Sequence, residues 1–102
     1  MCTYNRRFCL KQAIDSVLCQ TYPDFEFVIV DDGSTDGTEE LIKSYQDPRI
    51  RYFKLNRNSF YCYAANQGLD HCQGDYVAFM NSDDAWLPDK LEKQVTVMER
   101  IG

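Results

Sequence analysis

The sequence has no apolar stretch that approaches the ~18 residues needed to cross a membrane, and its first residues lack the pattern of a signal peptide. It has one histidine, and none of its five cysteines stands in the CxxC spacing of zinc sites. This pattern favours reduced thiols that pack as small apolar residues, as in a reducing cytoplasm. We therefore expect a cytoplasmic domain, held at the inner face of a membrane only through segments outside this chain.

Positive charge is also scarce, since 11 Lys and Arg against 16 Asp and Glu leave a net charge of −5. Non-specific nucleic-acid binding depends on basic side chains, so we expect no nucleic-acid partner. A phosphorylated ligand stays compatible with this charge, because a divalent cation can bridge carboxylates and phosphates. The 102 residues, 44% apolar and 26% charged, have the composition of a globular protein and suffice for one small domain over 1–102.

Apolar periodicity along the chain alternates between the helical and the extended type. It predicts helices at 8–19, 36–47, 61–72 and 88–101, and strands at 25–30, 50–55 and 76–80. The strand at 25–30 is nearly continuous in apolar character, which is typical of a strand buried on both faces. This order predicts an α/β fold with helices on both faces of a mostly parallel sheet.

Three details of the helices follow from the same pattern. The first helix is expected to bury Phe8 on the same face as Ala13, Ile14, Val17 and Leu18. Asp36 and Glu39 have the spacing of a capping box at the start of the second helix. The last helix is expected to bury an apolar face made of Leu91, Val95, Met98 and Ile101.

Two of the predicted strands end in paired acids, at 31–32 and 83–84. Ligands of open α/β sheets bind beyond the carboxyl ends of the strands. If the two strands are close, four carboxylates flank one crevice, which suits a cation or a ligand rich in hydrogen-bond donors. The same residues also suit ordinary turns, because Asp bonds nearby backbone N–H groups. The pattern alone leaves both interpretations open.

Several segments resemble, in order and at fitting spacing, those of family 2 glycosyltransferases. They are TYNR at 3–6, SVLCQTYP at 16–23, VIVDDGSTD at 28–36, DPRIRY at 47–52, GDYVAFMNSDD at 74–84 and LPDKL at 87–91. The resemblance covers essentially the whole chain. It implies a Rossmann-like, three-layer α/β/α fold of the GT-A type, as one partial domain without the family's first strand and acceptor-binding half.

The resemblance also implies a function and a nucleotide site. It implies an inverting glycosyltransferase that moves a sugar from a nucleotide-sugar donor, expected to be a UDP-sugar, to a glycan or lipid-linked acceptor in polysaccharide synthesis. Asp32 matches the acid that accepts a hydrogen bond from the uracil ring, although it would bond thymine equally. Thr3 and Tyr4 match residues that flank the base, and Asn81 matches a position that can bind a ribose hydroxyl.

A divalent cation, Mn or Mg, is implied as cofactor. Asp83 matches the last acid of the family's D-x-D motif, which holds the metal on the diphosphate, and Asp84 follows as a second candidate ligand or a supporting residue. Such hard ions bind one or two carboxylates together with phosphates and waters. Arg6 and Arg7 flank the expected crevice and are candidates for phosphate contacts or for a solvated helix start.

The chain departs from the family pattern at several positions. Asn81 replaces the first acid of D-x-D, Ala65 a frequent Arg, Phe60 a loop Gly and Cys2 a Pro, so we expect weaker donor and metal binding. The catalytic base is expected beyond Gly102, because the family keeps its acceptor site there. We therefore expect the isolated chain to bind donor but to transfer sugar very poorly.

Two other interpretations remain at this point. A receiver-like phosphoacceptor domain also places paired acids and magnesium at a strand end, but it needs a lysine that closes a later strand, and the 76–80 segment has none. A non-catalytic remnant that folds only as part of a larger assembly is the second. A monomeric chain that melts cooperatively would count against that remnant.

Overall fold

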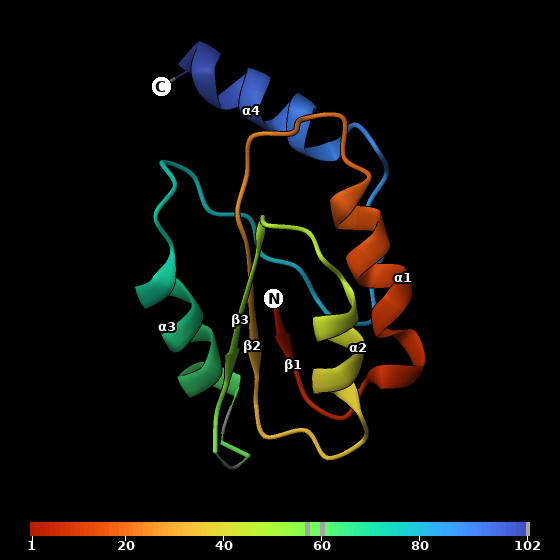
Figure 1. Ribbon diagram of the computed structural model, residues 1–102. Helices are drawn as coiled ribbons and strands as arrows, with labels where there is room; N and C mark the ends of the chain where they lie inside the picture. Colours follow the sequence, from red (N-terminus) through yellow and green to blue (C-terminus); the bar gives the residue numbers. More distant parts are fainter. Residues whose placement is uncertain (57, 60, 102) are drawn as a thin grey trace.

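The protein forms three layers, with a parallel sheet between helices (Figure 1). The computed structural model describes residues 1–56, 58–59 and 61–101, with the side chains of all of these except 61 and 62. Its elements are β1 (Cys2–Thr3), α1 (Arg7–Leu18), β2 (Phe27–Asp31), α2 (Thr38–Ser44), β3 (Ile50–Lys54), α3 (Tyr61–His71) and α4 (Lys90–Ile101). The strands lie in the order β1-β2-β3, with α1 and α2 on one face and α3 on the other, which confirms the predicted α/β class.

The central strand β2 explains why the fold has two cores. All five of its residues are buried, and successive side chains point to opposite faces of the sheet. Phe27 and Ile29 face α1 and α2, while Val28 and Val30 face Ala64 of α3. A strand covered on both sides has no polar face, and this is the origin of its apolar sequence.

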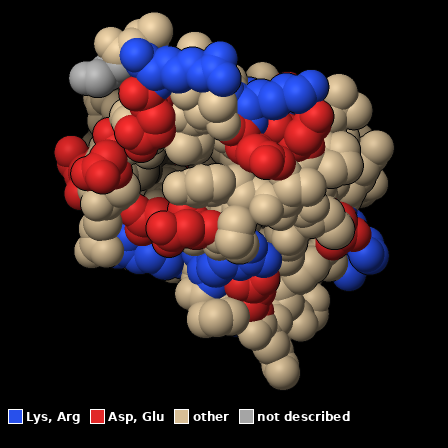
Figure 2. All heavy atoms as spheres, turned by 90° about the horizontal axis from the view of Figure 1, so that it is seen from above, with Lys and Arg blue, Asp and Glu red and all other residues tan. Residues whose placement is uncertain are grey.

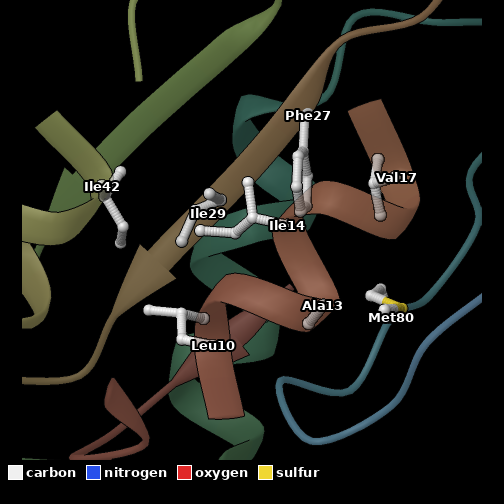
Figure 3. Close-up of a cluster of buried hydrophobic side chains, with 8 residues drawn as sticks. All are labelled: Leu10, Ala13, Ile14, Val17, Phe27, Ile29, Ile42 and Met80. Carbon is white, nitrogen blue, oxygen red and sulfur yellow. The ribbon is translucent and has the colours of Figure 1, made fainter. Parts of the chain in front are cut away.

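The larger core lies between α1 and the sheet (Figure 3). Its buried members are Leu10, Ala13, Ile14, Val17, Phe27, Ile29, Ile42 and Met80. Phe8 does not join them, contrary to expectation, and is 80% exposed. At about 100° per residue, Phe8 points roughly opposite to Leu10, so one helix face cannot bury both. The periodicity therefore identified the helix, while one member of its buried face was wrong.

The predicted strand at 76–80 was wrong, and this segment has no regular secondary structure. It approaches the sheet through one isolated parallel bridge, Cys2 to Asn81, while Tyr76, Val77 and Phe79 are exposed. A strand needs neighbouring backbone along its length, and β1 is only two residues long. Beyond the bridge to Asn81, β1 therefore offers the 76–80 segment no backbone with which to pair.

A wide apolar hollow of about 1080 Å³ lies beside that segment. It is bordered by 76–80, by α4 and by the start of β2. None of the described residues of α4 is buried, and Met98 and Ile101 of its expected apolar face are exposed. The helix itself was predicted correctly, but its apolar face contributes little to the core.

The start of α2 also differs from the prediction. The helix begins at Thr38 after Gly37, which adopts a left-handed conformation with φ of 88°. Asp36 Oδ1 accepts hydrogen bonds from the Thr38 amide at 3.2 Å and hydroxyl at 2.5 Å. Glu39 forms ion pairs with Lys43 and Lys54 instead of reaching back toward Asp36, so the capping box was wrong.

The outer surface mixes charges of both signs. Figure 2 shows the end of the molecule near α4, where acidic and basic side chains lie interspersed. One pair at the start of α4 joins Lys93 to Asp89 at 2.9 Å. In the part of the chain that the structure describes, no helix has the length and apolar character of a membrane span.

Candidate functional site

A smaller and more polar hollow, of about 460 Å³, lies where the strands end. Its lining comes from four segments that are distant in sequence: Cys2, Thr3, Tyr4 and Arg6; Asp32; Asn58, Ser59 and Ala64; and Asn81, Ser82 and Asp83. Its volume falls within the range of small-molecule sites. Open α/β sheets bind ligands at this end of the strands. The hollow, rather than the larger apolar one beside α4, is therefore the candidate site.

The acids at the end of β2 separate onto opposite faces of the sheet. Asp31 continues the alternation of Phe27 and Ile29 and is 0% exposed on the side of α1 and α2. Its carboxylate accepts hydrogen bonds from the Ser34 amide at 2.9 Å and the Tyr52 hydroxyl at 2.6 Å. Burial, followed by the nearby Asp31, raises the pKa of Tyr52 well above its ordinary value. Asp31 therefore holds the turn after β2 and does not face the hollow.

Asp32 points to the opposite face and lines the hollow, although it is only 5% exposed. Its Oδ1 accepts hydrogen bonds from the Ser59 amide at 2.9 Å and the Ser59 hydroxyl at 2.7 Å. Asn58 Nδ2 donates to Oδ2 at 3.2 Å. Sequence reasoning missed Asn58 and Ser59, which lie after the carboxyl end of β3. Their polar loop at a strand end was the signal that could have found them.

The end of β1 is fastened to the loop after β2. The Asp32 amide donates to the Thr3 carbonyl at 2.8 Å, and the Asn5 amide donates to Ser34 Oγ at 2.9 Å. Asn5 adopts a left-handed φ of 49°, which turns the chain sharply from β1 toward α1. Its side chain accepts a bond from the Thr35 amide at 2.8 Å. These contacts fix Thr3 and Asp32 relative to each other.

Thr3 and Tyr4 differ in their availability to a ligand. Thr3 is 3% exposed, and its hydroxyl is the one buried side-chain polar atom without a hydrogen-bond partner among the described residues. An orphaned buried hydroxyl calls for an explanation, and a ligand contact is one. Tyr4 lines the hollow and is 44% exposed. Arg6 also lines it, whereas Arg7 is engaged with Asp36 and Gly37.

The acidic turn at 83–84 contributes one carboxylate to the hollow. Asn81 Nδ2 donates to Asp84 Oδ2 at 3.1 Å, and the Asp84 amide returns a bond to the Asn81 carbonyl at 3.1 Å. Asp84 therefore closes this turn and does not line the hollow, whereas Asp83 does. Of the four carboxylates expected at one crevice, Asp32 and Asp83 are the two that line it. The other two lie elsewhere, because Asp31 faces the opposite side of the sheet and Asp84 accepts the turn bond from Asn81.

The oxygen ligands of this hollow suit a divalent cation that is bound together with phosphates. The described residues hold no cluster of three or more His, Cys, Asp or Glu that would form a metal cage. Among the described residues, none donates a hydrogen bond to the carboxylate of Asp83, which is exposed and lines the hollow. Mg²⁺ and similar ions bind through one or two carboxylates together with substrate phosphates. Asp83 therefore fits that type of site, and the side-chain oxygen Oδ1 of Asn81 is nearby in sequence.

One departure from the family pattern lies away from this hollow. Ala65 lines the larger apolar hollow and is not among the residues that line the polar one. Phe60 lies outside the described residues.

The likeness to known proteins covers nearly the whole chain. The sequence profile of "Glycosyl transferase family 2" matches residues 1–102. TuaG of Bacillus subtilis, whose name places it in teichuronic acid biosynthesis, is 46% identical over 98 residues, which are 94% of this chain and 39% of TuaG. An uncharacterized glycosyltransferase of Haemophilus influenzae is 42% identical over 96% of this chain and 40% of its own length. The chain thus spans less than half the length of these relatives.

Solved structures agree with this likeness. The crystal structure of S. aureus TarS 1–349 in complex with UDP has a TM-score of 0.91 and 28% identity, over 97% of this chain and 30% of TarS. The mannosyltransferase PcManGT from Pyrobaculum calidifontis, in complex with GDP-Man and Mn²⁺, has a TM-score of 0.77 and 27% identity, over 83% of this chain and 26% of its own. The match to TarS confirms the expected GT-A-type fold.

Proposed function

Because this chain belongs to glycosyl transferase family 2, we propose that it forms the donor-binding part of a glycosyltransferase, and that its donor is a UDP-sugar. The observation that carries this proposal is the polar hollow at the strand ends, where Asp32 and Asp83 line a common space large enough for a small ligand. The UDP complex of TarS and its UDP-GlcNAc complex support a uridine nucleotide.

Different residues of the hollow are assigned to the base and to the ribose of the nucleoside. Asp32 accepts a hydrogen bond from the base, and the exposed ring of Tyr4 offers an aromatic face beside it. The Asn81 amide nitrogen is held by Asp84, which leaves its carbonyl oxygen to accept a bond from a ribose hydroxyl. The buried hydroxyl of Thr3 lies in the same wall.

The diphosphate is assigned to the Asp83 side of the hollow. Asp83 would hold a divalent cation there, and such an ion offsets the charge that develops on the departing diphosphate. Arg6 provides a further positive charge on the wall. At a net charge of −5, the chain has few other groups to balance phosphates, so a cation is the natural partner.

Transfer itself needs an acceptor hydroxyl and a base within hydrogen-bond reach of it. We assign both to the part of the relatives that lies beyond this chain's match, and we propose inversion at the anomeric carbon. The name of TuaG, which refers to teichuronic acid biosynthesis, supports a polysaccharide as the product. We further propose a cell-surface polysaccharide, built on a glycan or lipid-linked acceptor in the cytoplasm at the inner membrane face.

Calorimetric titration of UDP, with and without Mn²⁺, tests the proposal. We expect Mn²⁺ to tighten UDP binding, and Asp83→Asn to remove that gain because an amide carries no charge for the cation. Asp75→Asn is the matched control, since this exposed acid lies outside the polar hollow. Equal binding with and without Mn²⁺, or equal loss in both variants, would contradict the assignment of the metal to Asp83.

A further inference from the structure

We propose that Asn58 and Ser59 set the base selectivity of this site, by occupying all but one of the acceptor positions of Asp32. The single position that remains suits a base with one ring N–H, such as uracil, and disfavours guanine. The inference rests on the proposed function, and it concerns residues that have no part in the metal site.

The acceptor positions of Asp32 can be counted directly. An ionised carboxylate offers about four lone-pair positions, two on each oxygen. The Ser59 amide and hydroxyl, at 2.9 and 2.7 Å, fill both positions on Oδ1. Asn58 Nδ2 fills one position on Oδ2 at 3.2 Å. No other donor among the described residues reaches this carboxylate, so one position on Oδ2 is left for a ligand.

This remaining position matches the pairing edge of uracil, which carries one N–H between two carbonyl groups. Guanine carries two adjacent N–H donors, which are best satisfied by both oxygens of a carboxylate. With Oδ1 filled, one guanine donor would be buried without a partner in a site where Asp32 is 5% exposed. Cytosine presents a bare ring nitrogen at this place, and it has no proton to donate to the carboxylate.

Structures of this fold hold both kinds of base. TarS is solved with UDP and PcManGT with GDP-Man. The fold therefore leaves the choice of base open, and local contacts must decide it. From the cost of one unpaired donor, we expect UDP to bind this chain roughly 10- to 100-fold more tightly than GDP.

The test is a titration of UDP, GDP and CDP, each with Mn²⁺, into the wild-type chain and four variants, one of which is Asp32→Asn. Ser59→Ala deletes the hydroxyl and frees one position on Oδ1, so GDP should gain roughly tenfold relative to UDP. Ser59→Thr keeps the hydroxyl and should keep the wild-type ratio. Asn58→Ala frees a position on Oδ2 and should move the ratio in the same direction as Ser59→Ala.

The outcomes separate this inference from the proposed function. If Asp32→Asn weakens UDP but Ser59→Ala and Asn58→Ala leave the UDP-to-GDP ratio unchanged, the donor site stands and the selectivity role is refuted. If the wild-type chain binds GDP as tightly as UDP, the selectivity role is also refuted. If Asp32→Asn leaves UDP binding intact, or no diphosphate binds the folded chain, the proposed function falls and this inference with it.

Discussion

Removing one hydroxyl, by Tyr52→Phe, should destabilise the protein strongly because of where its partner lies. Tyr52 donates at 2.6 Å to Asp31, which is 0% exposed and has only the Ser34 amide as a further donor among the described residues. A hydrogen bond to a charged group contributes about 1.5–3 kcal/mol, and its loss leaves a buried carboxylate oxygen unpaired. We expect that cost in unfolding free energy, and a melting temperature lower by roughly 10 °C.

Tyr45→Phe supplies a matched control. Tyr45 also donates at 2.6 Å to a carboxylate, but its partner Asp15 is 42% exposed and is paired with Lys11 on the surface. Water can replace the lost hydroxyl there, so the expected cost is below about 1 kcal/mol. Urea unfolding followed by circular dichroism measures both. Equal losses for the two variants would refute the claim that burial of Asp31 decides the effect.

The remaining predictions concern α2, the pH range and the acidic turn. Gly37→Ala should cost about 1 kcal/mol or more in urea unfolding, because φ is 88° and the new Cβ would lie 2.8 Å from Arg7 Nη1; an unchanged midpoint would contradict this conformation. Burial and a carboxylate partner raise the pKa of both tyrosines above their unfolded value of about 10. Their stabilisation is then complete below pH 10 and lost above it, so melting temperatures should fall more steeply there for the wild type than for the double Phe variant. Asp84→Asn should weaken Mn²⁺-dependent UDP binding less than Asp83→Asn, since an amide oxygen can still accept the turn bond.

The sequence predicted the order of elements because burial on both faces leaves a clear apolar signal in β2. It failed at 76–80, where an equally apolar run stays outside the sheet. Apolar character reports a tendency toward burial, whereas a strand also requires neighbouring backbone, and periodicity cannot reveal how much backbone β1 offers. The exposure of Phe8 is a smaller error of the same kind, because the rotation of a helix about its axis decides which of its residues face the sheet.

The candidate site shows a similar division. The pattern pointed to the paired acids at 31–32 and 83–84, and the family resemblance named Asp32 and Asp83, which both line the polar hollow. The alternation of side chains along β2 would have separated Asp31 from Asp32 in advance. The bonds from Asn58 and Ser59 to Asp32 were beyond sequence reasoning, because they depend on how the loop after β3 packs against the end of β2.

The most direct test of the central claim is to map where UDP contacts this chain. Amide chemical shifts, recorded by NMR during a titration with UDP and Mg²⁺, distinguish the polar hollow from the larger apolar one. We predict that the shifts concentrate at Thr3, Tyr4, Asp32 and 81–83, around the polar hollow at the strand ends. Shifts that concentrate instead at 76–79 and α4, around the larger apolar hollow, would contradict the account.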